Sequence, residues 1–266
     1  MKLRRLTLVI CLLFLVSMLA SGSTTASLIE SLPVRQQYQV QIITPLGEEE
    51  YRYFVDYQVL EDAQQLQVTI DGSGYISTTF YDHRLNLIQG EMEVIDTEDI
   101  ARVGFDRRVA IAIPEKEQII LEFYLAEDLQ LSRELYPPNN NATEIGILGL
   151  YLQALLHKSG IANLEFHGNL FDINRGSYFK LGTSLLTGAE VEKLAAGLRV
   201  PQQVKAILSD PNQIFVFKLG YTGIVRWFIP NQFYVVLEKA APHRILAFWG
   251  GSSKLLRYEI YSCPEH

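Results

Sequence analysis

Hydrophobic and polar positions alternate along most of the first half of this chain. In the segment 51–60 the odd positions from Tyr51 to Val59 are all apolar or aromatic, whereas most even positions are polar. Because side chains in a β-strand point alternately to its two faces, this pattern predicts a strand with one buried aromatic face. The same period predicts strands at 66–70, 75–81, 85–94, 103–113 and 118–125, with turns at 71–74 and 82–84.

A break at 137–141 separates these strands from a segment with a different pattern. Asn141 can accept from first-turn amides and Glu144 follows three residues later, as in a capping box. His157 and Lys158 suit the last turn of a helix, and Gly160 can end it. Apolar residues surround most of this predicted helix, so we expect it to be covered on more than one side.

Alternation returns after the helix and predicts strands at 164–171, 178–186, 214–219, 224–228, 233–237, 245–249 and 255–261. The segment 189–196 has helical spacing among these strands and is interpreted as a short helix or an irregular connection. Strands that follow one another with few helices between them pair antiparallel. The predicted fold class is therefore mainly β with a few helices: a curved antiparallel sheet or half-barrel with a helix packed across it.

The first 26 residues have the pattern of a cleavable export signal. Basic residues at positions 2, 4 and 5 precede an apolar stretch from Leu6 to Ala20, and small residues follow it. Cleavage fits after Gly22 or after Ala26. The apolar stretch is shorter than the roughly 20 residues that a membrane span needs, which disfavours a retained anchor. We expect a signal peptide at 1–26, a single β-rich domain at 27–266, and a soluble periplasmic or secreted product without a stable membrane span.

Charge and cysteine content narrow the classes of partner. Removing the leader would take away three basic residues and change the net charge from −7 to −10. An acidic chain repels phosphate backbones, so we expect no nucleic-acid partner. Cleavage would also remove Cys11 and leave Cys263 alone, so no intrachain disulfide can form and the core must supply the stability.

No catalytic or cofactor motif emerges from the sequence. The five histidines include no pair at the spacing of a zinc site, and neither a G-x-S-x-G elbow nor a phosphate-binding glycine loop occurs. The acidic residues around 91–99 could serve a glycosidase if two of them faced each other across a cleft. We therefore predict no catalytic residue, no metal site and no cofactor, and keep an envelope hydrolase as the least favoured alternative.

Three stretches carry a resemblance to a known family: Leu150 to Leu155 in the helix, Tyr178 to Gly182, and the closing run from Trp227 to Tyr261. They resemble exported bacterial proteins of domain of unknown function family 3108, which in turn resemble the lipoprotein-carrier fold of LolA and LolB. Family members often carry Arg where this chain has Gln153. The resemblance implies a half-barrel sheet with a helix across its open face and a place in the cell envelope, but no reaction.

A half-open sheet has one concave face that must be covered or occupied. We predict that this protein binds an apolar or lipid-like ligand there, with no protein partner identifiable. The alternative is a filled core in a structural or protein-interaction module of the envelope, since aromatic stripes mostly pack. The residues predicted to contact the ligand are Leu148, Tyr151, Leu152, Leu155, Phe217, Trp227, Phe233 and Trp249.

Overall fold

The computed structural model describes residues 27–72, 74–137, 143–160, 167–172, 177–197, 199–221, 232–251 and 256–264. Within these residues all strands belong to one sheet of 15 strands, and the fold class is mainly β, as the alternating pattern predicted. The first eight strands are β1 (Arg35–Ile43), β2 (Glu49–Leu60), β3 (Gln65–Gly72), β4 (Tyr75–Tyr81), β5 (Leu87–Val94), β6 (Arg107–Ile113), β7 (Gln118–Leu125) and β8 (Asp128–Leu135).

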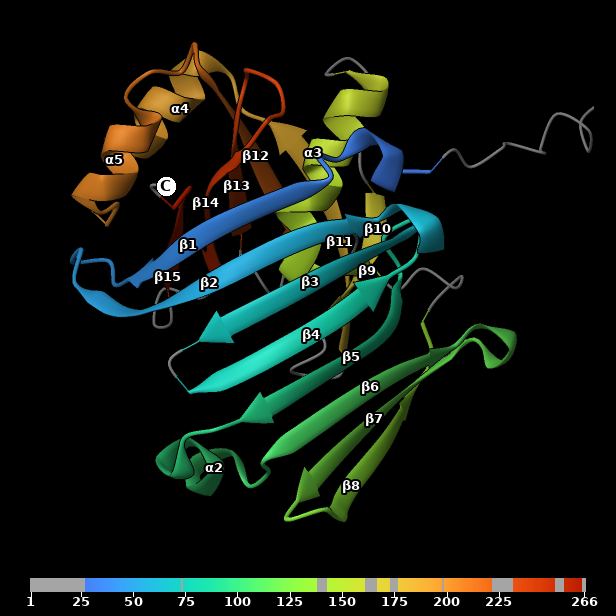
Figure 1. Cartoon of the computed structure of the whole chain (residues 1–266). Coiled ribbons are helices and arrows are strands. Elements are labelled where there is room, and N and C mark those ends of the chain that lie inside the picture. The colour runs from blue at the N-terminus through green and yellow to red at the C-terminus, as the bar shows by residue number, and fades with distance from the viewer. Residues whose placement is uncertain are drawn as a thin grey trace, which may run out of the picture.

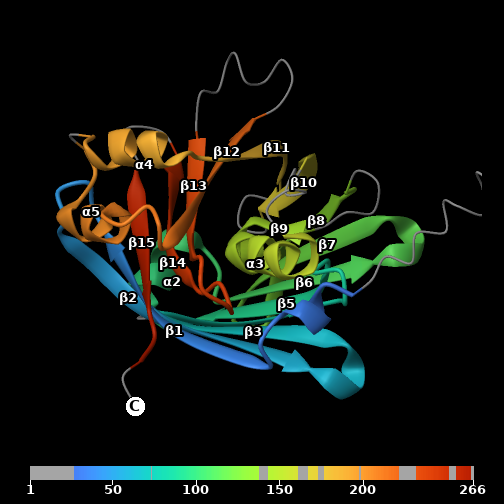
Figure 2. The same ribbon diagram turned by 90° about the horizontal axis from the view of Figure 1, so that it is seen from above.

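The remaining strands are β9 (Thr143–Glu144), β10 (His167–Asp172), β11 (Ser177–Leu185), β12 (Ile214–Tyr221), β13 (Gln232–Glu238), β14 (Ile245–Gly251) and β15 (Arg257–Ser262). Strands β1 to β8 form a meander, and β15 pairs with β1, so the two halves of the chain meet in the middle of the sheet. All neighbouring pairs are antiparallel except β9 and β10. Figure 1 shows the meander, and Figure 2 shows that the two halves of the curved sheet stand on either side of α3 (Leu148–Ser159).

Two apolar clusters cover the two faces of the sheet. The first lies on the concave face, where strand residues such as Tyr38, Val55 and Phe217 belong to the same cluster as the buried residues of α3. The second lies on the opposite face of the C-terminal strands and is covered by α4 (Gly188–Ala195) and α5 (Gln202–Leu208). The core thus follows the two-residue period, since neighbours such as Val216 and Phe217 belong to different clusters.

Helix α3 is buried on several sides, which confirms the expectation from its all-round apolar pattern. Leu148, Leu150, Leu152 and Leu156 are all buried, and the Gly160 amide bonds the Leu156 carbonyl at the C-terminus. The predicted start of this helix was wrong. Thr143 and Glu144 pair with β10, so the backbone there is extended and the helix begins only at Leu148, after a 3-10 turn.

One other boundary differs from the prediction, and the open assignment at 189–196 is a short helix. The segment predicted as a strand at 103–113 begins at Arg107, because α2 (Thr97–Val103) precedes it and the Asp96 carboxylate caps two amides of its first turn. The ambiguous segment 189–196 is α4, whose N-terminus has a capping box formed by Thr187 and Glu190. Strands β1 and β8 and helix α5 were not among the predicted elements. The leader 1–26, the predicted strand at 224–228 and Asn141 lie outside the described residues.

Candidate ligand-binding cavity

A cavity of about 480 Å³ lies on the concave face of the sheet, under the start of α3. Strands β2 to β6 form one wall, strands β13 to β15 form the other, and residues 146–149 close it at the N-terminal end of the helix. The register between paired strands explains which residues line the cavity, because residues directly opposite each other in paired strands point to the same face. Ser77 stands opposite both Ile70 and Met92, and all three line the cavity.

Most of the residues that line the cavity are aromatic or aliphatic, and the tyrosines add polar hydroxyls to its wall. Tyr53, Tyr57, Tyr75, Tyr81, Tyr261, Phe233 and Phe248 contribute the rings, and Val55, Val68, Ile70, Met92, Ile147, Leu148 and Ile245 contribute aliphatic side chains. Ligand sites for small molecules are commonly lined this way, with a few polar groups that set orientation. The polar groups here are Ser77, Thr79, Arg108 and Glu259.

Glu259 is a carboxyl group placed among tyrosines. Its Oε2 accepts hydrogen bonds from the Tyr261 hydroxyl at 2.8 Å and from the Tyr53 hydroxyl at 3.3 Å. By surface area Glu259 is half-buried, because it faces the cavity, although protein atoms surround it closely. Burial raises the pKa of Glu259, and the two hydroxyl hydrogen bonds offset part of that effect. The proton therefore stays on this carboxyl to higher pH than on an ordinary glutamate.

The neighbouring tyrosines are held neutral by the same environment. Burial is the main cause that raises the pKa of Tyr53 and of Tyr261 well above the usual value, and the Glu259 carboxylate adds to it. Burial also raises the pKa of Tyr75 to about 12, against an opposing effect of the Arg108 guanidinium. These hydroxyls therefore act as hydrogen-bond donors and acceptors, not as charges, throughout the physiological range.

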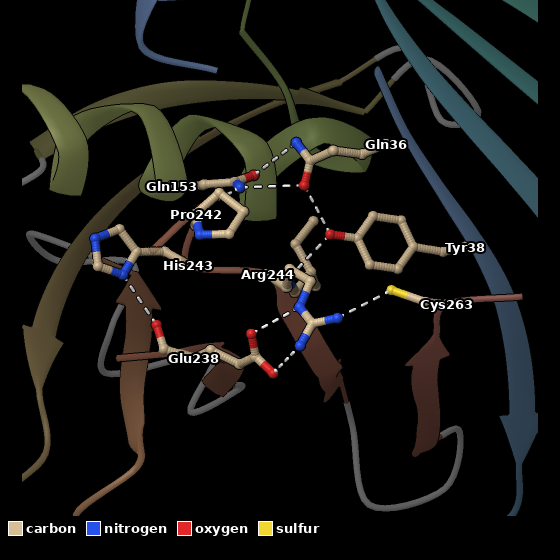
Figure 3. Close-up of polar contacts among 9 residues, drawn as sticks. Gln36, Tyr38, Gln153, Glu238, Pro242, His243, Arg244 and Cys263 are labelled. Atoms are coloured by element: carbon tan, nitrogen blue, oxygen red, sulfur yellow. Dashed lines mark hydrogen bonds and ion pairs between the residues drawn. The ribbon is translucent and has the colours of Figure 1, made fainter. Parts of the chain in front are cut away.

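A polar network fixes α3 in place over the sheet (Figure 3). Gln153 is fully buried in the middle of the helix, and its amide exchanges hydrogen bonds of 3.1 and 3.2 Å with the amide of Gln36 in β1. The Gln153 amide also donates to the Pro242 carbonyl in the turn between β13 and β14. Tyr38 extends the network, because its hydroxyl donates to Gln36 and accepts from the Ile245 amide. The helix is thus bonded to both halves of the sheet beside the cavity.

The same view shows a second polar group near the C-terminus (Figure 3). Arg244 forms an ion pair of 2.7 Å with Glu238 and contacts the Sγ of Cys263 at 3.5 Å. Cys263 is free and exposed. His243 contacts the Glu238 carbonyl, and its ring lies 5.1 Å from that of His157, so the fold brings together two histidines that are far apart in sequence.

The residues predicted to bind a ligand occupy different parts of the molecule. Leu148 and Phe233 line the cavity. Leu152 and Phe217 are fully buried in the concave-face cluster, and Tyr151 and Leu155 are half-buried against it. Trp249 lies in the cluster on the opposite face, where it stacks on Tyr234. Trp227 is outside the described residues.

Sequence reasoning did not single out the polar residues of the cavity. The sequence contained an indication for Glu259. It lies two residues before Tyr261 in β15, so both side chains point to the same face of the sheet. Arg108 carries the same signal in β6, where it shares a face with Ala110. A charged residue in a row of inward positions indicates a buried polar site, since charges are rarely buried without a partner.

Within the described ranges, no three His, Cys, Asp or Glu side chains cluster in a way that could hold a metal ion. In that same part of the chain, every helix is too short or too polar to cross a membrane.

The strand order and register define the class of this protein: a mainly β protein with a large, open, antiparallel sheet. No family model matches the chain, and no curated protein matches it. Among solved structures, the chain is similar to a beta-barrel-like protein of domain of unknown function DUF1849 from Brucella abortus. The TM-score is 0.45 at 8% identity, covering 86% of this chain and 95% of that one.

Proposed function

We propose that this protein binds an apolar or lipid-like ligand in the cavity between α3 and the concave face of the sheet. The observation that carries the proposal is the cavity itself: a space of about 480 Å³ whose lining residues are mostly aromatic and aliphatic, with tyrosine hydroxyls and a few other polar groups among them. Ligand-binding pockets of proteins fall in the range of about 300–1,000 Å³ and have such walls. A module with a filled core would leave no such space between α3 and the sheet.

An exported location is part of the proposal. The basic, apolar and small-residue regions of the first 26 residues support it. On this proposal the mature chain is released into the periplasm or the medium. N-terminal sequencing of the exported protein tests it, and an uncleaved Met1 would contradict it.

The arrangement of the acidic residues gives no support to a hydrolase. Asp96 caps α2, Asp99 pairs with Arg102, and Glu91 pairs with Arg107 at 3.5 Å. Each of these carboxylates thus has a structural partner, and none of them lines the cavity.

A cavity-filling substitution tests the proposal. Thr79 and Thr78 are neighbours in β4, but Thr79 lines the cavity and Thr78 points to the other face. The reporter is N-phenyl-1-naphthylamine, a neutral apolar dye whose fluorescence rises when it leaves water. We expect wild-type protein and the Thr78→Tyr variant to bind the dye, and the Thr79→Tyr variant to lose at least about tenfold in affinity because the larger ring takes up the space.

Circular dichroism and thermal unfolding would establish that both variants are folded. Absence of binding to wild-type protein, or equal affinity of the two folded variants, would contradict the proposal. If Thr79→Tyr does not fold, competition of the dye by dodecanol on wild-type protein still decides whether an apolar chain enters a saturable site.

A further inference from the structure

Glu259 is a carboxyl group on the cavity wall. Its hydrogen bonds come from the Tyr53 and Tyr261 hydroxyls, and both reach Oε2. Within the described part of the chain, no ion pair is formed by this carboxyl, and no cationic side chain contributes to its pKa shift. An ionised carboxylate so enclosed is unfavourable until a positive charge compensates it.

Aromatic rings surround this carboxyl and face the same space. Phe248 stands directly opposite Glu259 in the neighbouring strand, and Tyr53, Tyr57 and Tyr261 line the cavity with it. The ring of Tyr38 holds Tyr57 and Tyr261 in edge contacts at 5.9 and 5.6 Å. Rings placed around a carboxylate form the environment that binds ammonium groups, because the negative ring faces attract a cation while excluding water.

The other charged residue of the wall is Arg108, which is 6% exposed. It is engaged in an interaction within the protein, as Glu259 is with the Tyr53 and Tyr261 hydroxyls. The acidic balance of the chain, with 30 acidic against 23 basic residues, favours the approach of a cation over that of an anion.

We infer that the ligand carries a positively charged amine or quaternary ammonium head on an apolar body, with the head seated against Glu259 among the rings of Tyr53, Tyr57, Tyr261 and Phe248. This inference rests on the proposed function, because the apolar body must occupy the same cavity. It adds the chemical class of the head group.

The test compares three probes with the same dodecyl chain and different heads: dodecyltrimethylammonium, dodecanol and dodecanoate, each below its micelle concentration. Displacement of N-phenyl-1-naphthylamine from wild-type protein measures the affinity of each. We expect dodecyltrimethylammonium to bind at least about tenfold more tightly than dodecanol, and dodecanoate to bind most weakly. The Glu259→Gln variant keeps the shape of the side chain and should remove this advantage of the ammonium probe.

Glu115→Gln is the matched control, because Glu115 is an exposed carboxyl in the turn after β6 and far from the cavity lining. It should leave all three affinities unchanged. The pH dependence provides a second readout that needs no variant. Since dodecyltrimethylammonium has a permanent charge, its affinity should rise as pH rises through the raised pKa of Glu259. The titratable groups that interact electrostatically with this carboxyl are Tyr51, Tyr53 and Tyr57 from β2, Tyr75 from β4, and Tyr261, and burial keeps these hydroxyls neutral over that interval. Arg108 lines the same cavity and stays protonated throughout.

The outcomes separate the two proposals. If dodecanol displaces the dye but dodecyltrimethylammonium has no advantage over it, the inference about the head group is wrong and the proposed function stands. If dodecanoate binds most tightly, the head site belongs to Arg108 and the inference is also wrong. If no probe displaces the dye, or the dye does not bind, both are wrong.

Discussion

At the scale of single residues, the feature that distinguishes the cavity from an ordinary core is Glu259. Its alternation with Tyr261 places the carboxyl among aromatic side chains, and burial then raises its pKa. The sequence could predict the face on which Glu259 lies, because that depends on the two-residue period alone. It could not predict the contact with Tyr53, which lies 206 positions away and comes close only through the pairing of β1 with β15.

The pKa of Glu259 makes a prediction about stability. Because the pKa is higher in the folded chain than in the unfolded chain, the folded state holds the proton more tightly. The contribution of Glu259 to stability is therefore fully present below the unfolded pKa, near 4.3, and is lost as pH rises through the folded pKa. Glu259→Gln does not titrate, so the variant should gain stability relative to ligand-free wild type between acidic and neutral pH.

Urea unfolding at a series of pH values measures this difference, with Glu115→Gln as the control that should follow wild type. A difference between Glu259→Gln and wild type that stays constant with pH, or that favours wild type increasingly toward neutral pH, would contradict the assignment of a raised pKa to this carboxyl.

At the scale of elements, α3 shows what sequence patterns determine and what they leave open. The sequence showed apolar residues on most sides of the helix, basic residues in its last turn and Gly160 at its C-terminus, and the structure has all three. The N-terminal boundary was not predictable from the capping pattern, because the pairing of Thr143 and Glu144 with β10 depends on a distant segment. Local caps stabilise α2, which the sequence analysis did not predict, and α4, which it left open, whereas a contact that holds α3 comes from the distant Gln36.

The network around Gln153 makes a prediction about this element. Gln153→Leu removes three hydrogen bonds and leaves the Gln36 Nε2 and the Pro242 carbonyl without the Gln153 partner, whereas Gln36 Oε1 keeps its bond from the Tyr38 hydroxyl. We expect a loss of about 2 kcal/mol in the free energy of unfolding, since buried polar groups that lose their partners cost this much. Chemical denaturation measures it.

Gln202→Leu is the control, because Gln202 is exposed at the start of α5 and its replacement should change the free energy of unfolding by no more than about 0.5 kcal/mol. Equal effects of the two substitutions would mean that the network does not hold α3 in place.

At the scale of the whole molecule, the mainly β class and the antiparallel pairing follow from the alternating pattern and the short connections. The closure of β15 onto β1 does not, because it joins segments from opposite ends of the chain. A helix packed across the curved sheet was predicted, and α3 lies there. Trp249 illustrates this limit. The alternation in β14 showed which residues share a face with Trp249, but it did not show that α4 and α5 would cover that face. Whether the concave face would be filled or hollow depends on the same long-range arrangement.

Photo-crosslinking with a dodecyl alcohol that carries an aliphatic diazirine tests the central claim most directly, because peptide mass spectrometry then reports where the chain of the ligand lies. The account predicts that crosslinks fall on cavity residues such as Val55, Val68, Leu148 and Phe233, and that excess dodecanol suppresses them. Crosslinks confined to the exposed strand β8 or to the face covered by α4 and α5 would contradict it.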